Sequence, residues 1–176
     1  MKKLNTLKFY SLAFLLMVGL LSAQSISGKS IKVSVDGTSP MHNWTMNAST
    51  GTFSATVSGN TLTNIKFSVP TKSLKSTKGK MMDNKAHGAL KADKAPQINF
   101  TAKSVNVGKG TLSGSLSIAG VTKNVSFPAT VVKNGSSYTI SGTDQLKMSD
   151  FGMETPGFMG VKTGDAVTVK VNIVAN

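Results

Sequence analysis

The most constraining feature of this sequence is a strict alternation of apolar and polar residues on both sides of a turn at Gly120. On one side Leu116 and Ile118 are separated by serine, and on the other an apolar residue stands at every second position from Val125 to Val131. Because successive side chains of a strand point to opposite faces, this pattern predicts a β-hairpin with one apolar and one polar face. The same alternation recurs through most of the chain, so we expect an antiparallel β structure around one enclosed apolar space.

Eight segments carry this pattern, and the chain between Gly79 and Ala92 has helical spacing instead. Closure into a barrel removes exposed strand edges, so the predicted fold class is all-β: an eight-stranded antiparallel barrel with one short helix after the third strand. A barrel of eight strands is either filled by side chains or holds one small ligand. Its predicted lining is mostly Val, Ile, Ala and Leu, which leaves room. The segments are 31–35, 53–57, 65–69, 98–102, 112–118, 125–132, 138–140 and 167–173.

Residues 1–23 are typical of a cleaved secretory signal. Lysines at the start precede an apolar run from Leu12 to Leu21, and the small residues Ser22 and Ala23 offer a cleavage point. An uncleaved anchor is disfavoured, because a membrane span needs roughly 18 apolar residues. We therefore expect export to the periplasm or the extracellular space, and one domain over residues 24–176.

The charge of the chain is strongly positive. Twenty lysines and no arginine face 7 acidic residues, giving a net charge of +13; removing the three lysines of residues 1–23 leaves 17 against 7, or +10. Nucleic-acid binders favour arginine and aromatic side chains, and aromatics make up 6% here, so no nucleic-acid partner is expected. The alternatives are solvated lysines on polar strand faces and attraction to an anionic membrane surface. Five lysines predicted on such faces are Lys32, Lys66, Lys103, Lys123 and Lys170.

Three blocks in a fixed order, within residues 29–174, resemble the YceI-like family of periplasmic lipid-binding proteins. They are His42-Asn43-Trp44; Met82-Asp83-Asn84 leading through residues 89–92 to Pro96-Gln97-Ile98-Asn99-Phe100; and residues 116–123 continuing into 147–152 and the terminal valine strand. The resemblance implies an extended lipocalin-like barrel that holds a polyisoprenoid or a similar long apolar chain.

The predicted function is that of a non-enzymatic binding protein with a long-chain lipid in the barrel, acting as a monomer or homodimer. Met82 and Phe151 lie in the two segments that would cover an end of the barrel, as a portal or as an ordinary plug. Trp44 is expected on the wall or at the mouth of the cavity, or as a core residue that caps the barrel. The remaining predicted lining residues are Phe53, Ile65, Phe67, Ile98, Phe100, Leu116, Ile118 and Phe127.

A second hypothesis is a cationic interaction module, with a core filled by side chains, that binds an acidic envelope partner. The two hypotheses differ in whether the barrel interior is empty, and lipid extraction would return nothing under the second.

No catalytic or metal-ligating arrangement is apparent in the sequence. The chain has no cysteine, which excludes disulfides and thiol nucleophiles, and His42 and His87 are too few for a structural zinc site. A glycosidase would need two carboxylates across a cleft, whereas the C-terminal acids are predicted to be solvated loop residues. No enzyme activity, metal or cofactor is expected, apart from a bound isoprenoid-type lipid. These acids are Asp144, Asp150, Glu154 and Asp165.

Overall fold

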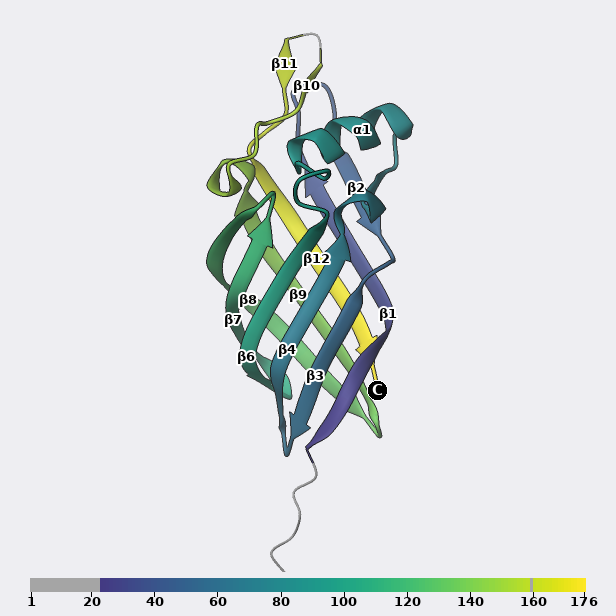
Figure 1. Ribbon diagram of the computed structural model, residues 1–176, viewed down its shortest axis with the longest axis vertical. Coiled ribbons are helices and arrows are strands. Elements are labelled where there is room, and N and C mark those ends of the chain that lie inside the picture. The colour runs from purple at the N-terminus through teal and green to yellow at the C-terminus, as the bar shows by residue number, and fades with distance from the viewer. Residues whose placement is uncertain (1–22, 159) are drawn as a thin grey trace, which may run out of the picture.

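In the computed structural model, which describes residues 23–158 and 160–176, the alternating segments form a closed antiparallel barrel (Figure 1). Eight strands close it in the order β12-β9-β8-β7-β6-β4-β3-β1, and β1 pairs back onto β12. The predicted fold class is therefore confirmed, including the position of the helix after the third barrel strand. The predicted secretory signal lies outside the described residues except for its last position.

At one end the long strands are connected by tight turns only, and at the other end by one tight turn and by longer connections that contain the short elements. The barrel strands are β1 (Gln24–Gly37), β3 (Thr52–Ser58), β4 (Thr61–Pro70), β6 (Gln97–Asn106), β7 (Gly108–Ile118), β8 (Val121–Asn134), β9 (Ser137–Lys147) and β12 (Ala166–Ala175). The short elements are β2 (Trp44–Ala48), η2 (Thr71–Ser73), β5 (Lys75–Ser76), α1 (Lys80–Ala89), η3 (Met148–Phe151), β10 (Gly157–Phe158) and β11 (Val161–Lys162).

The first strand is longer than the alternation of residues 31–35 indicated. Its beginning, Gln24–Ser27, pairs with β3, and its end, Val33–Gly37, pairs with β2. The predicted second segment, 53–57, forms β3, whereas β2 was not predicted as a strand; β2 and β3 lie one after the other along β1. The far edge of β2 is covered by β5.

The hairpin of β7 and β8 forms as predicted. Ala119 and Gly120 make its two-residue turn with φ of 51° and 83°, and positive φ at both positions is what a type I′ hairpin turn requires. The register pairs Leu112 with Phe127 and Leu116 with Lys123. Lys123 thus shares the face of the cavity-lining Leu116, although it is exposed, and its predicted place on the polar face is wrong.

The helix and the connection between β9 and β12 lie at the same end of the barrel (Figure 1). The helix spans Lys80–Ala89, slightly less than the predicted 79–92. Among the described residues, no helix has both the length and the apolar character needed to cross a membrane.

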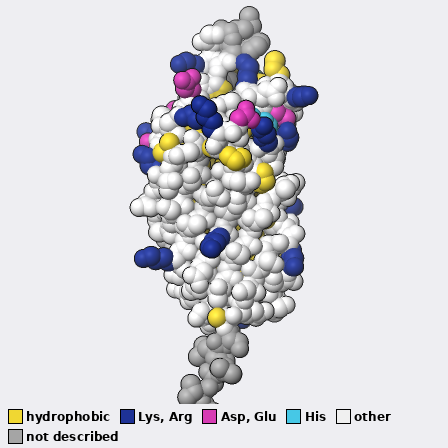
Figure 2. Space-filling model, in the orientation of Figure 1, with side chains coloured by type: hydrophobic (Ala, Val, Ile, Leu, Met, Phe, Trp, Pro, Cys, Tyr) yellow, Lys and Arg dark blue, Asp and Glu magenta, His cyan; other side chains and the backbone are white. Residues whose placement is uncertain are grey.

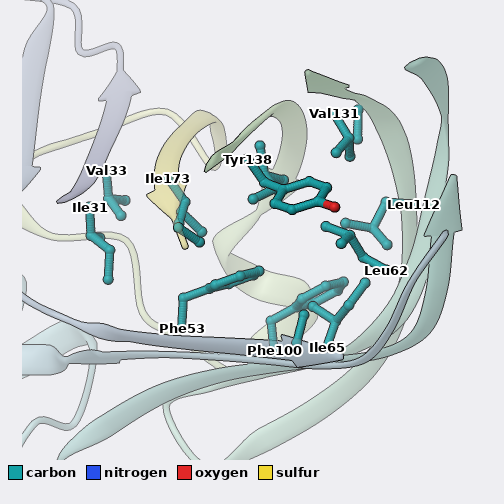
Figure 3. Packing of buried hydrophobic residues seen from close by; sticks show 14 of the residues in the cluster. Ile31, Val33, Phe53, Leu62, Ile65, Phe100, Leu112, Val131, Tyr138 and Ile173 are labelled. Atoms are coloured by element: carbon teal, nitrogen blue, oxygen red, sulfur yellow. The ribbon is translucent and has the colours of Figure 1, made fainter. Parts of the chain in front are cut away.

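At the opposite end, beside the tight turns, the barrel is closed by its own side chains. Figure 3 shows Tyr138, Val131, Leu112 and Leu62 packed together there, and all four are buried. This packing gives the barrel a filled base, so any internal space lies toward the helix-bearing end.

Candidate functional site

Above this filled base the barrel interior contains an apolar cavity. The cavity has a volume of about 200 Å³. This is far more than the roughly 10–15 Å³ that a single water molecule needs, so the cavity has room for a segment of an apolar chain. In the described part of the chain, the lining is apolar side chains and one glycine, apart from Ser141, Asp144 and Lys147.

Three aromatic rings on the cavity wall lie over glycines of neighbouring strands. A Cβ added at Gly37 would overlap the Trp44 ring, and one added at Gly142 would come within 2.9 Å of the Phe127 ring. Phe100 covers Gly114 in the same way and lies 5.7 Å from Phe127 between ring centroids. The absence of a side chain lets each ring lie flat against the wall, so the rings leave the centre open.

The structure brings most of the predicted lining residues together. Trp44 lies at the helix-bearing end of the cavity, half-buried, and its Nε1 donates a hydrogen bond to the carbonyl oxygen of Thr38 at 3.3 Å. Met82 is half-buried in α1 but does not line the cavity. The predicted residues that line it are Trp44, Phe53, Ile65, Phe67, Ile98, Phe100, Leu116, Ile118, Phe127 and Phe151.

Sequence reasoning missed a large part of the wall. The inward-facing valines of β1 and β12 belong to it, and so does Met46 of β2; the alternation of the two valine strands was a sufficient signal for the first group. Leu90 contributes from the segment of helical spacing and Met148 from the irregular connection, and neither was predicted to line the cavity. The missed valines are Val33, Val35, Val167, Val169 and Val171.

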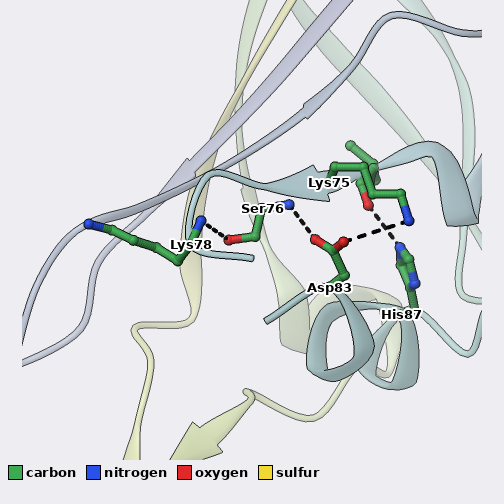
Figure 4. A network of polar contacts seen from close by, with 6 residues as sticks. Lys75, Ser76, Lys78, Asp83 and His87 are labelled. Atoms are coloured by element: carbon green, nitrogen blue, oxygen red, sulfur yellow. Dashed lines mark hydrogen bonds and ion pairs between the residues drawn. The ribbon is translucent and has the colours of Figure 1, made fainter. Parts of the chain in front are cut away.

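The helix is held over the barrel by a polar network (Figure 4). Asp83 accepts a hydrogen bond from the backbone N–H of Ser76 at 2.6 Å and forms an ion pair with Lys75 at 3.6 Å. Nε2–H of His87 donates to the carbonyl oxygen of Leu74 at 2.8 Å. Both side chains therefore fix α1 to the chain that precedes it, and Leu74 itself is buried against the cavity.

Two lysines bridge the two covering segments. Nζ of Lys85, on α1, donates to the carbonyl oxygen of Gly157 at 2.7 Å, and Nζ of Lys91 donates to that of Gly152 at 3.0 Å. Phe151, next to Gly152 in sequence, is 2% exposed and lines the cavity. Exposed ammonium–carbonyl bonds contribute little to stability, so this contact between the covers can open without disturbing the barrel.

Asp144 is a carboxylate on the inner face of the barrel. It lies in β9 between Gly142 and Leu146, which also line the cavity, and it pairs with the inward-facing Val169 of β12. Burial raises the pKa of its carboxyl group, and the backbone N–H of Gln145 opposes this in part. The expectation that Asp144 is a solvated loop acid is therefore wrong, because it occupies an inward position of a regular strand.

We expect Asp144→Asn to stabilise the protein at neutral pH, raising Tm by about 1–2 °C. Because the folded-state pKa is raised, the charged carboxylate disfavours the folded state at neutral pH. As the pH falls through the folded-state pKa, the folded protein takes up a proton first, so the gain of the variant shrinks and is absent below the ordinary carboxyl pKa. Thermal unfolding followed by circular dichroism at about pH 7 and about pH 3.5 measures this.

The matched control is Asp150→Asn, which removes the same charge from an exposed residue of η3. An equal rise in Tm for both variants, or a gain for Asp144→Asn that does not depend on pH, would show that the position of Asp144 is not the cause.

Neither histidine belongs to a metal-type cluster within residues 23–158 and 160–176. His42 is exposed and His87 is occupied by the hydrogen bond described above. The described side chains include no group of three or more His, Cys, Asp or Glu residues placed to hold a metal ion.

Comparison with known proteins gives a family and a fold. The model of the YceI-like domain matches residues 24–175. Burkholderia cenocepacia BcnA is 21% identical with a TM-score of 0.71, covering 83% of this chain and 96% of its own. A polyisoprenoid binding domain from Saccharophagus degradans, implicated in plant cell wall breakdown, is 11% identical with a TM-score of 0.67, covering 86% and 97%.

A third structure, the YCEI protein of Campylobacter jejuni, is 23% identical with a TM-score of 0.52 and covers 64% of this chain and 71% of its own. Identities this low show a shared fold only. No curated protein sequence matches this chain.

Proposed function

This chain belongs to the YceI-like domain family, and on that basis we propose that it is a non-enzymatic binding protein that holds a polyisoprenoid or similar long-chain lipid in its barrel. The observation that carries the proposal is the apolar cavity between the filled base and the covering segments. The similarity in fold to a polyisoprenoid binding domain supports the class of ligand.

The free energy for binding comes from removing the lipid chain from water, at roughly 0.8 kcal/mol per CH₂ group. A membrane offers the same gain, so the barrel competes by the shape of its wall, where aromatic rings and branched side chains line a narrow space. The lipid would enter and leave at the end covered by α1 and η3, where exposed bonds from Lys85 and Lys91 join the two covers.

We extend the proposal to export into the periplasm or the extracellular space. Its support is the charge and apolar pattern of residues 1–23, together with a family match that begins at residue 24, the first residue after the expected cleavage point.

The test is native mass spectrometry of the purified chain after incubation with geranylgeraniol, a C20 prenol with a flexible apolar chain. We expect a one-to-one adduct of the prenol mass that survives gentle activation. Absence of any adduct under all conditions would contradict the proposal and favour the alternative, a cationic module that binds an acidic envelope partner. The open cavity weighs against that alternative, which requires an interior filled by side chains.

The covered end also has the features of a membrane-docking surface. Met41 and Met81 are 69% and 60% exposed, and exposed lysines lie close to Met81 in sequence at Lys78 and Lys80. Figure 2 shows lysine side chains gathered with apolar ones toward this end of the molecule. Exposed apolar tips among cations fit an anionic bilayer, since the tips enter the interface while the lysines meet the head groups.

We expect Met41→Glu/Met81→Glu to reduce binding to vesicles containing about 30% phosphatidylglycerol several-fold, measured by co-sedimentation. The control is Val132→Glu/Asn134→Glu, which places the same two charges at exposed residues of β8 near the turn between β8 and β9, at the filled end. Equal losses for the two proteins, or equal binding of the unmodified chain to neutral vesicles, would contradict docking by the covered end.

A further inference from the structure

Asp144, the acidic residue that lines the cavity, lies where neighbouring strands β8 and β9 of the barrel wall are no longer paired. Pairing between β8 and β9 ends at Ala129 and Gly142, so β9 continues past Gly142 without β8 beside it. Asp144 is the next inward position of β9, and the Phe127 ring covers Gly142 just below it. The carboxylate is partly exposed and partly enclosed, which places it at the border between the apolar space and solvent.

No lysine neutralises this carboxylate within the described residues. Lys72, Lys75 and Lys170 form ion pairs with Asp93, Asp83 and Asp36 instead. The lysine closest to Asp144 in the register is Lys170, next to the paired Val169, but it points to the outer face and is paired with Asp36. Lys147, three residues further along β9, borders the same cavity but is exposed, and Lys123, on the unpaired part of β8, is exposed as well. Asp144 therefore keeps its charge largely unpaired at neutral pH, at a cost that the raised pKa of its carboxyl group reflects.

An ionised carboxylate accepts hydrogen bonds and donates none. A hydroxyl or ammonium group brought beside it would complete its hydrogen bonding, whereas a phosphate or carboxylate would place two like charges together in a medium of low dielectric constant. The net charge of +10 for residues 24–176 attracts anions at long range, but that attraction is screened by salt beyond about 8–10 Å. The local carboxylate thus has the larger influence on a group held inside the wall.

We propose that Asp144 sets the polar end of the lipid that this barrel accepts: one that donates a hydrogen bond, such as an alcohol or amine, and not a phosphate or carboxylate. The inference rests on the proposed lipid-binding function and adds a selectivity to it. The chain of the lipid occupies the apolar space toward the filled base, and its polar end lies at Asp144 beside the break in the wall.

The experiment compares two probes with the same C20 tail, geranylgeraniol and geranylgeranyl monophosphate. Binding is followed at physiological salt through the fluorescence of Trp44, the single tryptophan of the chain, which lines the cavity. We expect the unmodified protein to bind the alcohol at least tenfold more tightly than the monophosphate. In Asp144→Asn this ratio should fall about tenfold, through tighter binding of the monophosphate.

Two controls separate this effect from others. Asp150→Asn removes an equal charge at exposed η3 and should keep the ratio of the unmodified protein. Folding of Asp144→Asn is verified by its Tm, expected to rise. Equal affinities of the unmodified protein for the two probes, or a ratio that Asp144→Asn leaves unchanged, would overturn the role of Asp144 while lipid binding stands. Failure of the unmodified protein to bind either probe would overturn both.

Discussion

Replacing Leu116 with tryptophan is expected to abolish binding of the C20 prenol, with the adduct in native mass spectra reduced at least tenfold. Leu116 lines the cavity from β7 and is only half-buried, so its side chain borders open space. An indole ring at this position would extend into the volume that the lipid chain needs. Overpacking of this kind costs about 1–3 kcal/mol of stability, which a barrel of this size should tolerate.

The matched control is Ser113→Trp on the same strand. Ser113 is exposed, and its odd-numbered position places it on the outer face, opposite to Leu116. Ser113→Trp adds the same indole ring outside the barrel, so this variant should still bind the prenol. If Leu116→Trp is folded by circular dichroism and still binds the prenol as tightly as Ser113→Trp, the lipid is not held in this cavity.

Replacing Gly114 with alanine is expected to lower the free energy of unfolding by about 2–4 kcal/mol. A Cβ at this position would overlap both the carbonyl oxygen of Thr101 and the ring of Phe100. The ring can turn away only into the cavity, and the backbone of β6 cannot move without breaking its pairing with β7. Equilibrium unfolding in urea gives the change directly.

Gly110→Ala supplies the comparison on the same strand. A Cβ at Gly110 meets nothing within 4 Å, so its effect should stay within about 0.5 kcal/mol. Equal unfolding free energies for the two variants would mean that β6 and β7 adapt to an added methyl group, and that Phe100 is not held against the wall by the glycine.

The alternation of polar and apolar residues along the chain determines much of the barrel. The alternation through residues 112–131 predicted the hairpin and its turn, because each strand residue has a neighbour of opposite polarity and the turn needs residues that tolerate positive φ. The change to helical spacing predicted α1 within a few residues of its ends. The alternation along the strands also placed aromatic and aliphatic residues such as Phe100 and Leu116 on the wall, since every second residue of a strand faces inward.

Other features depend on the tertiary structure and could not be predicted from the alternation along a strand. The place of Asp144 depends on β9 being regular through residue 144, whereas sequence reading grouped this residue with the acids of the following loop. Lys123 lies on the inner register but is exposed, because β8 leaves β9 above Ala129. Met82 and Phe151 were both predicted to cover an end of the barrel. Only the packing of η3 against the barrel shows that Phe151 lines the cavity and Met82 does not.

From the sequence by itself came the strand order along the chain, the two faces of each strand and the expectation of a roomy interior, all of which follow from a period of two and from residue size. Whether that interior is empty, where its wall is incomplete and which charge borders it were decided by the folded molecule. These properties depend on how segments distant in sequence approach one another, and the order of polar and apolar residues along one strand does not determine that approach.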